Sequence, residues 1–291
     1  MPERIKVLIV DDSRLFRSAL ETALTGHDDI KVVGSVFNGA KAIEFIARNP
    51  PDVVTLDVEM PGMSGLETLA KIQQLGDERP IGVVMVSAFT RRGADITVKA
   101  LQAGAFDFVT KPSGPSAEVN QTTLRDEVVA KIRACARQRA KSGVKTSARV
   151  AAPRKPSSVR ASAIRAIVIG ASTGGPRALA TLLPELCSLV SLPILIVQHM
   201  PPGFTRSLAE SLARETNKRV VEATDGVPLE SNSVYVAPGG KHLLIRGSSH
   251  AATAGLTDQP PENGCRPSAD VLFRSAAGVH GSGVAAIILT G

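Results

Sequence analysis

Short apolar runs alternate along the N-terminal half of the chain with stretches whose apolar residues recur at helical spacing. The runs have the length of buried β-strands, and the intervening stretches have the pattern of amphipathic helices. Strands are predicted at Ile5–Val10, Val32–Val36, Val53–Leu56, Val83–Val86 and Phe106–Val109. Helical spacing occurs within Leu15–Leu24, Ala40–Ile46, Val98–Leu101 and Leu124–Cys135. Because right-handed crossovers join strands that alternate with helices, this half is predicted to be a parallel, doubly wound α/β sheet.

The alternation stops near residue 140 and resumes near residue 164. The intervening segment, 140–163, is rich in Ala, Ser, Pro, Lys and Arg and has no period, which is typical of a flexible linker. Beyond it, strands are predicted at 166–170, 194–198, 233–237, 242–246 and 284–289, and helices at 176–183, 204–215 and 268–279. We therefore predict two α/β domains with parallel sheets, 1–139 and 164–291, joined by the linker.

The net charge of +7 is concentrated in this linker. Six Lys and Arg residues and no acidic residue lie in 141–163, and without them the chain would carry about +1. The sequence also has no Trp and only one Tyr. Since neither predicted domain has a basic face, the composition argues against nucleic-acid binding.

Nothing in the chain resembles a signal peptide, and no apolar run is long enough to span a bilayer, so we expect no membrane insertion. The cysteines lie far apart, without the spacing of a metal site, at Cys135, Cys187 and Cys265. They are predicted to be reduced thiols in a cytoplasmic protein.

Acidic residues follow two of the strands predicted in the first domain. Asp11 and Asp12 follow the first strand, and Asp57 follows the third. Ligands of open α/β sheets bind at the carboxyl ends of strands. Carboxylates that meet there suit Mg²⁺, while Ser87 and Lys111, at the ends of the next two strands, could hold a phosphoryl group.

The whole first half resembles the flavodoxin-like receiver domain of two-component response regulators. The matching motifs are Val10–Ser13, Leu56–Gly65, Ser87–Ala88 and Thr110–Pro112. The resemblance implies that Asp57 accepts a phosphoryl group from a histidine kinase. It implies Mg²⁺ bound by Asp12 and Asp57, by Asp11 through water, and by the Glu59 carbonyl. It further implies that Ser87 and Lys111 hold the phosphoryl oxygens. Phe108 would be the aromatic residue that responds when these two residues bind the phosphoryl group.

A serine in the second half lies at a sharp bend between a strand and a helix. Ser172 occurs in Ile169–Pro176, where almost every neighbouring residue is small. Such a turn exposes a hydroxyl for nucleophilic attack and places helix N-terminal N–H groups near developing negative charge. The alternative is structural, with Ser172 capping the helix and Pro176 in its first position.

Among the five histidines, His199 directly follows an apolar strand, Ile194–Gln198, and precedes a loop containing two prolines. It is therefore expected at the same sheet edge as Ser172, where it could act as general base. The alternative is that His199 caps the next helix, and His242 is the next candidate base. A dinucleotide site is disfavoured, because the third position of a Gly-x-Gly-x-x-Gly motif beginning at Gly170 is Ser172.

The second half resembles the Rossmann-like catalytic domain of chemotaxis response-regulator protein-glutamate methylesterases. Matching segments are Ile169–Pro176, Val197–Met200, Pro202–Phe204, Asp225–Gly226, Val234–His242 and Arg266–Ser275. The family hydrolyses glutamate γ-methyl esters on chemoreceptors and deamidates certain receptor glutamines. The resemblance implies that Ser172 is the nucleophile and His199 the base, without a cofactor for the esterase reaction.

The chain departs from the family's pattern at its end. The family's third triad member is an aspartate in a Gly-Met-Gly-x-Asp-Gly stretch, and Gly291 corresponds to the first glycine of that stretch. Neither Asp258 nor Asp270 matches the motif. We expect either that the sequence is a fragment of a longer product or that this chain is a poor esterase.

The sequence thus predicts a phosphorylation-regulated esterase that acts on chemoreceptors. One alternative is a non-catalytic response regulator whose second domain only binds a partner or drains phosphoryl groups. The other is a DNA-binding regulator, which the charge distribution disfavours.

Overall fold

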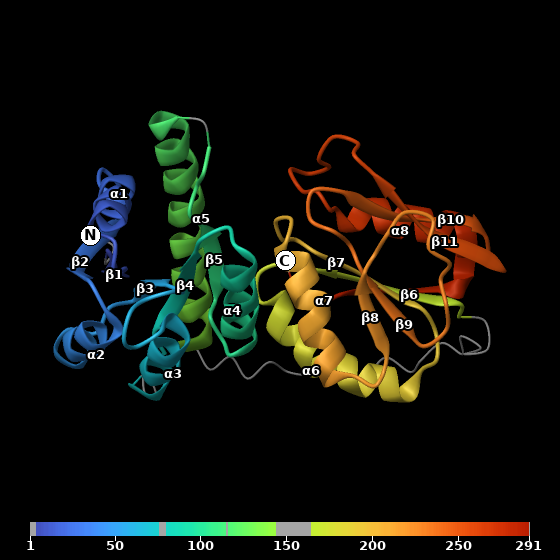
Figure 1. Ribbon diagram of the computed structural model, residues 1–291, viewed down its shortest axis with the longest axis horizontal. Helices are drawn as coiled ribbons and strands as arrows, with labels where there is room; N and C mark the ends of the chain where they lie inside the picture. The colour runs from blue at the N-terminus through green and yellow to red at the C-terminus, as the bar shows by residue number, and fades with distance from the viewer. Residues whose placement is uncertain (1–3, 76–79, 115, 144–163, 291) are drawn as a thin grey trace. The chain divides into compact units, whose positions relative to one another are not determined.

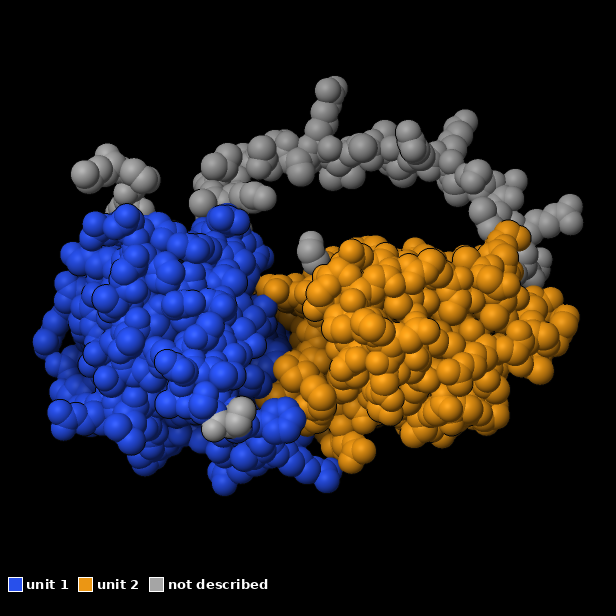
Figure 2. Space-filling model, turned by 90° about the horizontal axis from the view of Figure 1, so that it is seen from above, with its two compact units in different colours: residues 1–146 blue, residues 147–291 orange. Residues whose placement is uncertain are grey.

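The computed structural model describes residues 4–75, 80–114, 116–143 and 164–290. The chain forms two compact units, residues 1–146 and 147–291, which are coloured separately in Figure 2. In the described ranges, no helix has both the length and the hydropathy needed to cross a bilayer.

The first unit is a five-stranded parallel sheet in the order β2-β1-β3-β4-β5 (Figure 1). Its strands are β1 (Ile5–Val10), β2 (Ile30–Val36), β3 (Val53–Asp57), β4 (Gly82–Ser87) and β5 (Asp107–Thr110). Its helices are α1 (Arg14–Leu24), α2 (Gly39–Arg48), α3 (Gly65–Leu75), α4 (Arg91–Gln102) and α5 (Ala117–Gly143). Every residue of β3 is buried, as expected for a central strand covered by helices on both faces.

Helix α3 was not predicted, although its N-terminus carries a recognisable signal. The Ser64 and Glu67 side chains form a capping box: Ser64 Oγ accepts from the Glu67 N–H at 3.3 Å, and Glu67 Oε2 accepts from the Ser64 N–H at 2.8 Å. Leu69 and Ile72 then bury the apolar face of the helix. The helix also begins at a glycine that a larger residue could not replace, because a Cβ on Gly65 would lie 2.2 Å from the Asp57 carbonyl oxygen.

The predicted boundary at residue 140 does not coincide with the end of a helix. Helix α5 continues to Gly143, four residues into the segment predicted to be the linker. The Arg, Gln, Ala and Lys residues that precede Gly143 are good helix formers, which explains the continuation. The remainder of the predicted linker, 144–163, lies outside the described residues.

The second unit contains a five-stranded parallel sheet in the order β12-β6-β7-β9-β8. Its strands are β6 (Ala166–Ala171), β7 (Ile194–Gln198), β8 (Arg219–Glu222), β9 (Ser233–Val236) and β12 (Val284–Ile288). The helices are α6 (Gly175–Leu189), α7 (Phe204–Glu215) and α8 (Ala269–His280), and a short 3₁₀ turn, η2 (Gly281–Gly283), precedes β12. The prediction of two α/β domains with parallel sheets is confirmed.

Three features of the second unit differ from the predicted elements. Strand β8 was not predicted, because its four residues include only two apolar ones. The strand predicted at 242–246 lies outside the parallel sheet, where β10 (His242–Ser248) pairs antiparallel with the unpredicted β11 (Ala251–Thr257). Helix α6 continues past Pro184, where the sequence predicted its end, because Cys187 in the following turn is buried.

The β10–β11 hairpin and α8 complete the core of the second unit. Helix α8 contacts β10 as well as β6 and β12, and Figure 1 shows the hairpin beside this helix. The core between these elements contains Val168, Leu195, Tyr235, Leu243 and Leu272, each fully buried. The buried Tyr235 hydroxyl donates to the Pro228 carbonyl and accepts from the Glu230 N–H, so its polar atom is satisfied.

Helix α1 offers a matched pair of leucines for testing the packing of the first unit. Leu20 is fully buried, whereas Leu15 is 86% exposed. We expect Leu20→Ala to lower the free energy of unfolding of this unit by about 2–5 kcal/mol, and Leu15→Ala by less than about 0.5 kcal/mol. Amide hydrogen exchange of β1 and β3 reports on this unit alone. Equal protection in the two variants would contradict the assigned packing.

Candidate functional sites

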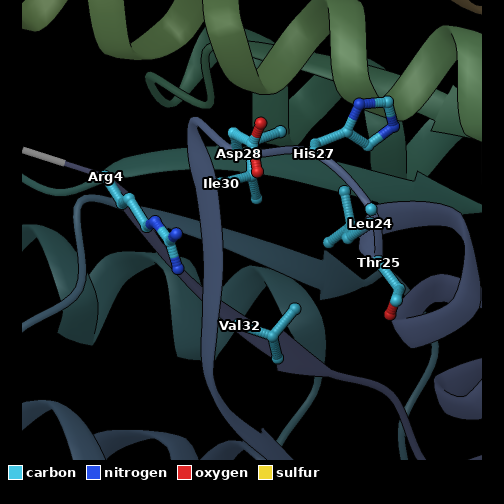
Figure 3. A pocket seen from close by; sticks show the side chains of 8 residues that line it. Arg4, Leu24, Thr25, His27, Asp28, Ile30 and Val32 are labelled. Carbon is cyan, nitrogen blue, oxygen red and sulfur yellow. The ribbon is translucent and has the colours of Figure 1, made fainter. Parts of the chain in front are cut away.

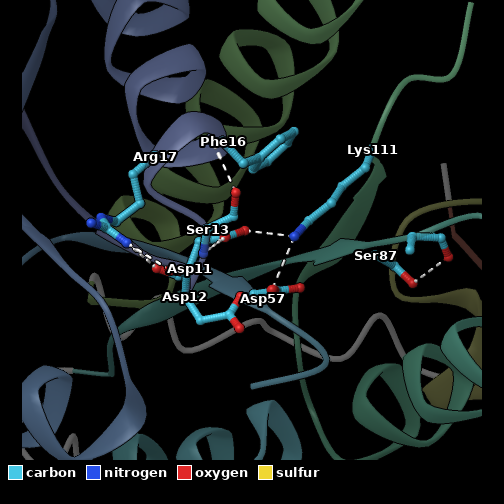
Figure 4. A network of polar contacts seen from close by, with 9 residues as sticks. Asp11, Asp12, Ser13, Phe16, Arg17, Asp57, Ser87 and Lys111 are labelled. Atoms are coloured by element: carbon cyan, nitrogen blue, oxygen red, sulfur yellow. Dashed lines mark hydrogen bonds and ion pairs between the residues drawn. The ribbon is translucent and has the colours of Figure 1, made fainter. Parts of the chain in front are cut away.

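Three carboxylates converge where β1 and β3 end. The two strands are parallel neighbours with Val10 paired to Leu56, so Asp11, Asp12 and Asp57 follow at the same edge. One carboxylate oxygen from each lies within 4.8 Å of the others. Asp11 and Asp57 are buried and Asp12 is exposed, so the cluster is open to solvent on one side. Figure 4 shows the three side chains together with Lys111.

Lys111 pairs with both buried carboxylates from the end of β5. Its Nζ lies 2.8 Å from Asp11 Oδ2 and 2.9 Å from Asp57 Oδ2. The ring of Phe16 lies on α1 with its centroid 4.7 Å from the same nitrogen, a cation–π geometry. Burial lowers the pKa of Lys111, but the hydrogen bond to Asp11 and the charges of both carboxylates outweigh it, and the pKa is raised. The lysine therefore remains a cation.

The pKa of Asp57 is raised from its ordinary value of 3.8 to about 6. Burial is the main cause, the Lys111 charge opposes it, and the negative charge of Asp11 adds to it. A backbone hydrogen bond from Glu59 acts in the opposite sense and favours the carboxylate. The ionised Asp57 is thus poorly compensated, which leaves a need for additional positive charge at this edge.

The other residues predicted for this site occupy several positions around it. Ser87 is fully buried at the end of β4, and its hydroxyl donates to the Ala88 carbonyl at 3.2 Å. The Glu59 carboxylate pairs with Arg92 at 3.1 Å. Phe108 is buried on β5, with the Lys131 ammonium 5.0 Å from its ring centroid.

In the second unit, Ser172 and His199 follow adjacent parallel strands at the same level. Ala171 at the end of β6 is paired with Gln198 at the end of β7, so the next residues are opposite each other. The His199 N–H donates to the Ala171 carbonyl at 3.0 Å, which extends the ladder to this point. The structure therefore brings the predicted nucleophile and the predicted base to one sheet edge.

The turn that contains Ser172 is fixed by backbone hydrogen bonds. The Ser172 carbonyl accepts from the Gly175 N–H at 2.8 Å, and the Ser172 N–H donates to Thr290 Oγ1 at 3.0 Å. Gly174 has a φ of +76°, a left-handed conformation that favours glycine. Ser172 itself is half-buried, which leaves it accessible at the start of α6.

His199 is a half-buried imidazole whose pKa is lowered, mainly by burial, while the negative charge of Asp270 opposes the shift. Its Nδ1 lies 3.7 Å from Cys265 Sγ. The lowered pKa favours the neutral imidazole at neutral pH, which is the form that a general base requires.

The structure excludes His242 as an alternative base. It is fully buried, its Nδ1 accepts from the Ser268 N–H at 3.1 Å, and its Nε2 lies 3.1 Å from the Pro260 carbonyl. Both ring nitrogens are therefore used to hold the loop that precedes α8. His250 and His280 instead contact Arg165 and Ser249, at 3.4 and 3.2 Å.

The sequence did not single out Gln198 as a functional residue. Its side-chain Nε2 donates to the Ser172 carbonyl at 2.8 Å and to the His199 carbonyl at 3.3 Å. The sequence does contain a signal for such a role. A glutamine that ends an otherwise apolar, buried strand needs hydrogen-bond partners for its amide.

A separate pocket of about 270 Å³ lies in the first unit, around the loop between α1 and β2. Its lining includes Arg4, His27, Asp28 and Val32 (Figure 3). Arg4 precedes β1 and Ile30, also in the lining, begins β2, so the pocket lies at the amino ends of these strands. It is at the opposite end of the sheet from the acidic cluster and contains none of the predicted site residues.

Both halves of the chain match known protein families. The response regulator receiver domain matches residues 7–122, and the CheB methylesterase domain matches residues 167–291. A protein-glutamate methylesterase/protein-glutamine glutaminase from Geobacillus kaustophilus is 44% identical over 290 residues, covering 99% of this chain and 81% of that protein. The protein of the same name from Pyrococcus horikoshii is 40% identical over 293 residues, covering 100% and 78%.

A solved structure is similar to part of this chain. The methylesterase catalytic domain of Thermotoga maritima CheB is 41% identical, with a TM-score of 0.42, and the match covers 44% of this chain and 68% of that chain.

The matches define the class as a carboxylic-ester hydrolase coupled to a response-regulator receiver. More specifically, the chain belongs to the protein-glutamate methylesterase/protein-glutamine glutaminase family. The resemblance inferred from the motifs is thereby confirmed.

The raised pKa of Asp57 predicts how the stability of the first unit depends on pH. In the folded state the carboxyl holds its proton up to about pH 6, whereas in the unfolded chain it loses it near 3.8. Holding this proton stabilises the folded state. The stabilisation is complete below about pH 4 and is lost as the pH rises through 6. Asp57→Asn, which carries no charge, should therefore stabilise the unit by about 1–3 kcal/mol at pH 7.5 and change little at pH 4.

Denaturant unfolding followed by hydrogen exchange of β3 at both pH values measures this difference. Asp126→Asn is the control, because that carboxylate is 66% exposed and its removal should change stability by less than about 0.5 kcal/mol. A loss of stability in Asp57→Asn at pH 7.5 would show that the ionised Asp57 is favourably compensated.

Proposed function

We propose that this chain hydrolyses glutamate γ-methyl esters and deamidates glutamines on chemoreceptors under the control of receiver phosphorylation. The observation that carries the proposal is the register of β6 and β7, which sets Ser172 opposite His199. The names of the curated relatives supply the two substrate types.

In the proposed reaction, Ser172 Oγ attacks the ester carbonyl carbon while His199 accepts the hydroxyl proton. The N-terminal end of α6 would favour the negative charge that develops on the carbonyl oxygen through its helix dipole. His199 then returns the proton to the methoxide oxygen, and methanol leaves. Water, deprotonated by His199, attacks the acyl-enzyme, and the proton passes to Ser172 as the glutamate carboxylate departs. Deamidation follows the same course with ammonia as the leaving group.

We propose that Asp57 is the phosphoacceptor in the receiver and that a histidine kinase is the phosphodonor. Asp12 and Asp57 would hold Mg²⁺, with Asp11 acting through water and the Glu59 carbonyl as a further ligand. The fit rests on three oxygen donors within 4.8 Å and on the exposure of Asp12 to solvent. When bound, Mg²⁺ would neutralise the phosphoryl oxygens.

The receiver's own residues would bind the transferred group. Lys111, already paired with Asp57, would contact a phosphoryl oxygen, and the buried Ser87 hydroxyl would contact another. Phe108 would respond when the Ser87 hydroxyl binds the phosphoryl oxygen. Phosphorylation would relieve inhibition of the second unit by no more than the difference in docking free energy between the phosphorylated and the unphosphorylated receiver.

The proposal predicts that Ser172→Ala abolishes methanol release from a methylated chemoreceptor. Because the variant lacks the attacking oxygen, we expect a loss of more than about 10³-fold in kcat. Ser188→Ala is the control, since this serine is exposed on the same helix, α6. Equal methanol release by the wild type and Ser172→Ala would show that Ser172 is not the nucleophile. Absence of release from the wild type would favour the non-catalytic alternative, in which the second unit only binds a partner.

The lowered pKa of His199 predicts the acid limb of the rate profile. Because burial disfavours the imidazolium, the neutral base should persist below the ordinary pKa of 6.5, and kcat/KM should fall only at lower pH. Asp270→Asn removes the opposing negative charge and should move the midpoint further toward acid. A midpoint above 6.5, or a shift toward alkali in Asp270→Asn, would contradict the assignment of His199 as the base.

A further inference from the structure

The side chain of Gln198 connects the backbones of the two residues proposed to carry the reaction. Its Nε2 donates to the Ser172 carbonyl at 2.8 Å and to the His199 carbonyl at 3.3 Å. Gln198 is only 2% exposed and is the last residue of β7, directly before His199. One amide group is thus shared between the nucleophile's turn and the base's loop.

The orientation of this amide follows from its neighbours. Both Ser172 and His199 present carbonyl oxygens, which can only accept, so the NH₂ group must face them. The opposite atom, Gln198 Oε1, is buried and has no hydrogen-bond partner among the described residues. A buried amide oxygen without a partner is unfavourable. The side chain thus makes both donated hydrogen bonds while its Oε1 atom lacks a partner.

The fold leaves space for this side chain at the start of α6. A Cβ on Gly175 would lie 1.9 Å from Gln198 Oε1, so a larger residue at that position would displace the amide. The Gly175 N–H donates to the Ser172 carbonyl as well, at 2.8 Å. The carbonyl of the nucleophile is thereby held from two sides, by the helix that follows it and by the adjacent strand.

We propose that Gln198 is a positioning residue that sets the separation and orientation of Ser172 and His199. The inference rests on the proposed function, because it assigns these two residues to the reaction. Gln198 does not touch the substrate in this proposal. It acts by hydrogen bonding to both carbonyls, so that the backbone at Ser172 and the backbone at His199 move together. Small displacements of reacting groups lower rates by about 10²-fold.

Gln198→Met tests the proposal, because Met has a similar length and cannot donate a hydrogen bond. We expect kcat for methanol release to fall about 10- to 100-fold while KM changes less than about twofold. Labelling of Ser172 by an alkyl fluorophosphonate, which needs the nucleophile and its base but no receptor, should slow by a similar factor. Unchanged kcat and labelling in folded Gln198→Met would overturn the proposal.

Gln73→Met is a control for the loss of an amide-to-carbonyl hydrogen bond at an exposed position. The Gln73 amide also donates to a backbone carbonyl, that of Ala103 at 2.7 Å, but it lies in the first unit. This variant should leave both kcat and the labelling rate unchanged. An equal loss of activity in Gln73→Met would show that losing such a hydrogen bond anywhere has this effect, and would also overturn the proposal.

Gln198→Glu provides a readout that a structural role would not change. An ionised Glu cannot donate to either carbonyl, whereas a protonated Glu can donate to one. The labelling rate relative to wild type should therefore rise as the pH falls from 8 to 5.5. A flat ratio would contradict the proposal, and this ratio decides the question if Gln198→Met fails to fold.

The two assays separate failure of the inference from failure of the proposed function. If Ser172 of the wild type is labelled but no methanol is released, the proposed esterase function is wrong. The labelling rates of the variants still test the positioning role of Gln198. If the wild type releases methanol and Gln198→Met matches it in both assays, the function stands and the positioning role is wrong.

Discussion

Both candidate sites depend on the parallel register of their sheets. In a parallel sheet the strands end at one edge, so residues that are far apart in sequence meet there. In the first unit the pairing of β1 with β3 brings Asp11 to Asp57, and in the second the pairing of β6 with β7 brings Ser172 to His199. A shift of one residue in either register would separate these groups and turn the side chains that follow to the opposite face.

The two edges differ in their electrostatics because their polar groups are compensated differently. At the first, two buried carboxylates share one lysine, and the pKa of Asp57 is raised to about 6. Additional positive charge at this edge would relieve this imbalance, which suits a cation site. At the second, burial lowers the pKa of His199 and favours the neutral imidazole, which suits proton transfer rather than ion binding.

Buried polar side chains hold backbone segments around the second site in place. His242 uses both ring nitrogens to fix the loop before α8, and Gln198 donates to the carbonyls of Ser172 and His199. Each removes freedom from a backbone segment that carries a functional group. Such groups stabilise one geometry only when their partners are present, so they link the packing of the core to the position of the site.

The sequence by itself determined the alternation of strands and helices, the two α/β units and the family, because apolar periodicity and short motifs are local properties. It also placed Asp11, Asp57, Ser172 and His199 at strand ends. Its omissions were elements with weak periodicity, namely α3, β8 and β11, and the continuation of α6 past Pro184. Only the tertiary structure decided that His242 is fully used in packing and that Gln198 joins two carbonyls. A local pattern could mark Gln198 as a polar residue that ends an apolar strand, but it could not reveal its partners, because hydrogen-bond partners depend on residues distant in sequence.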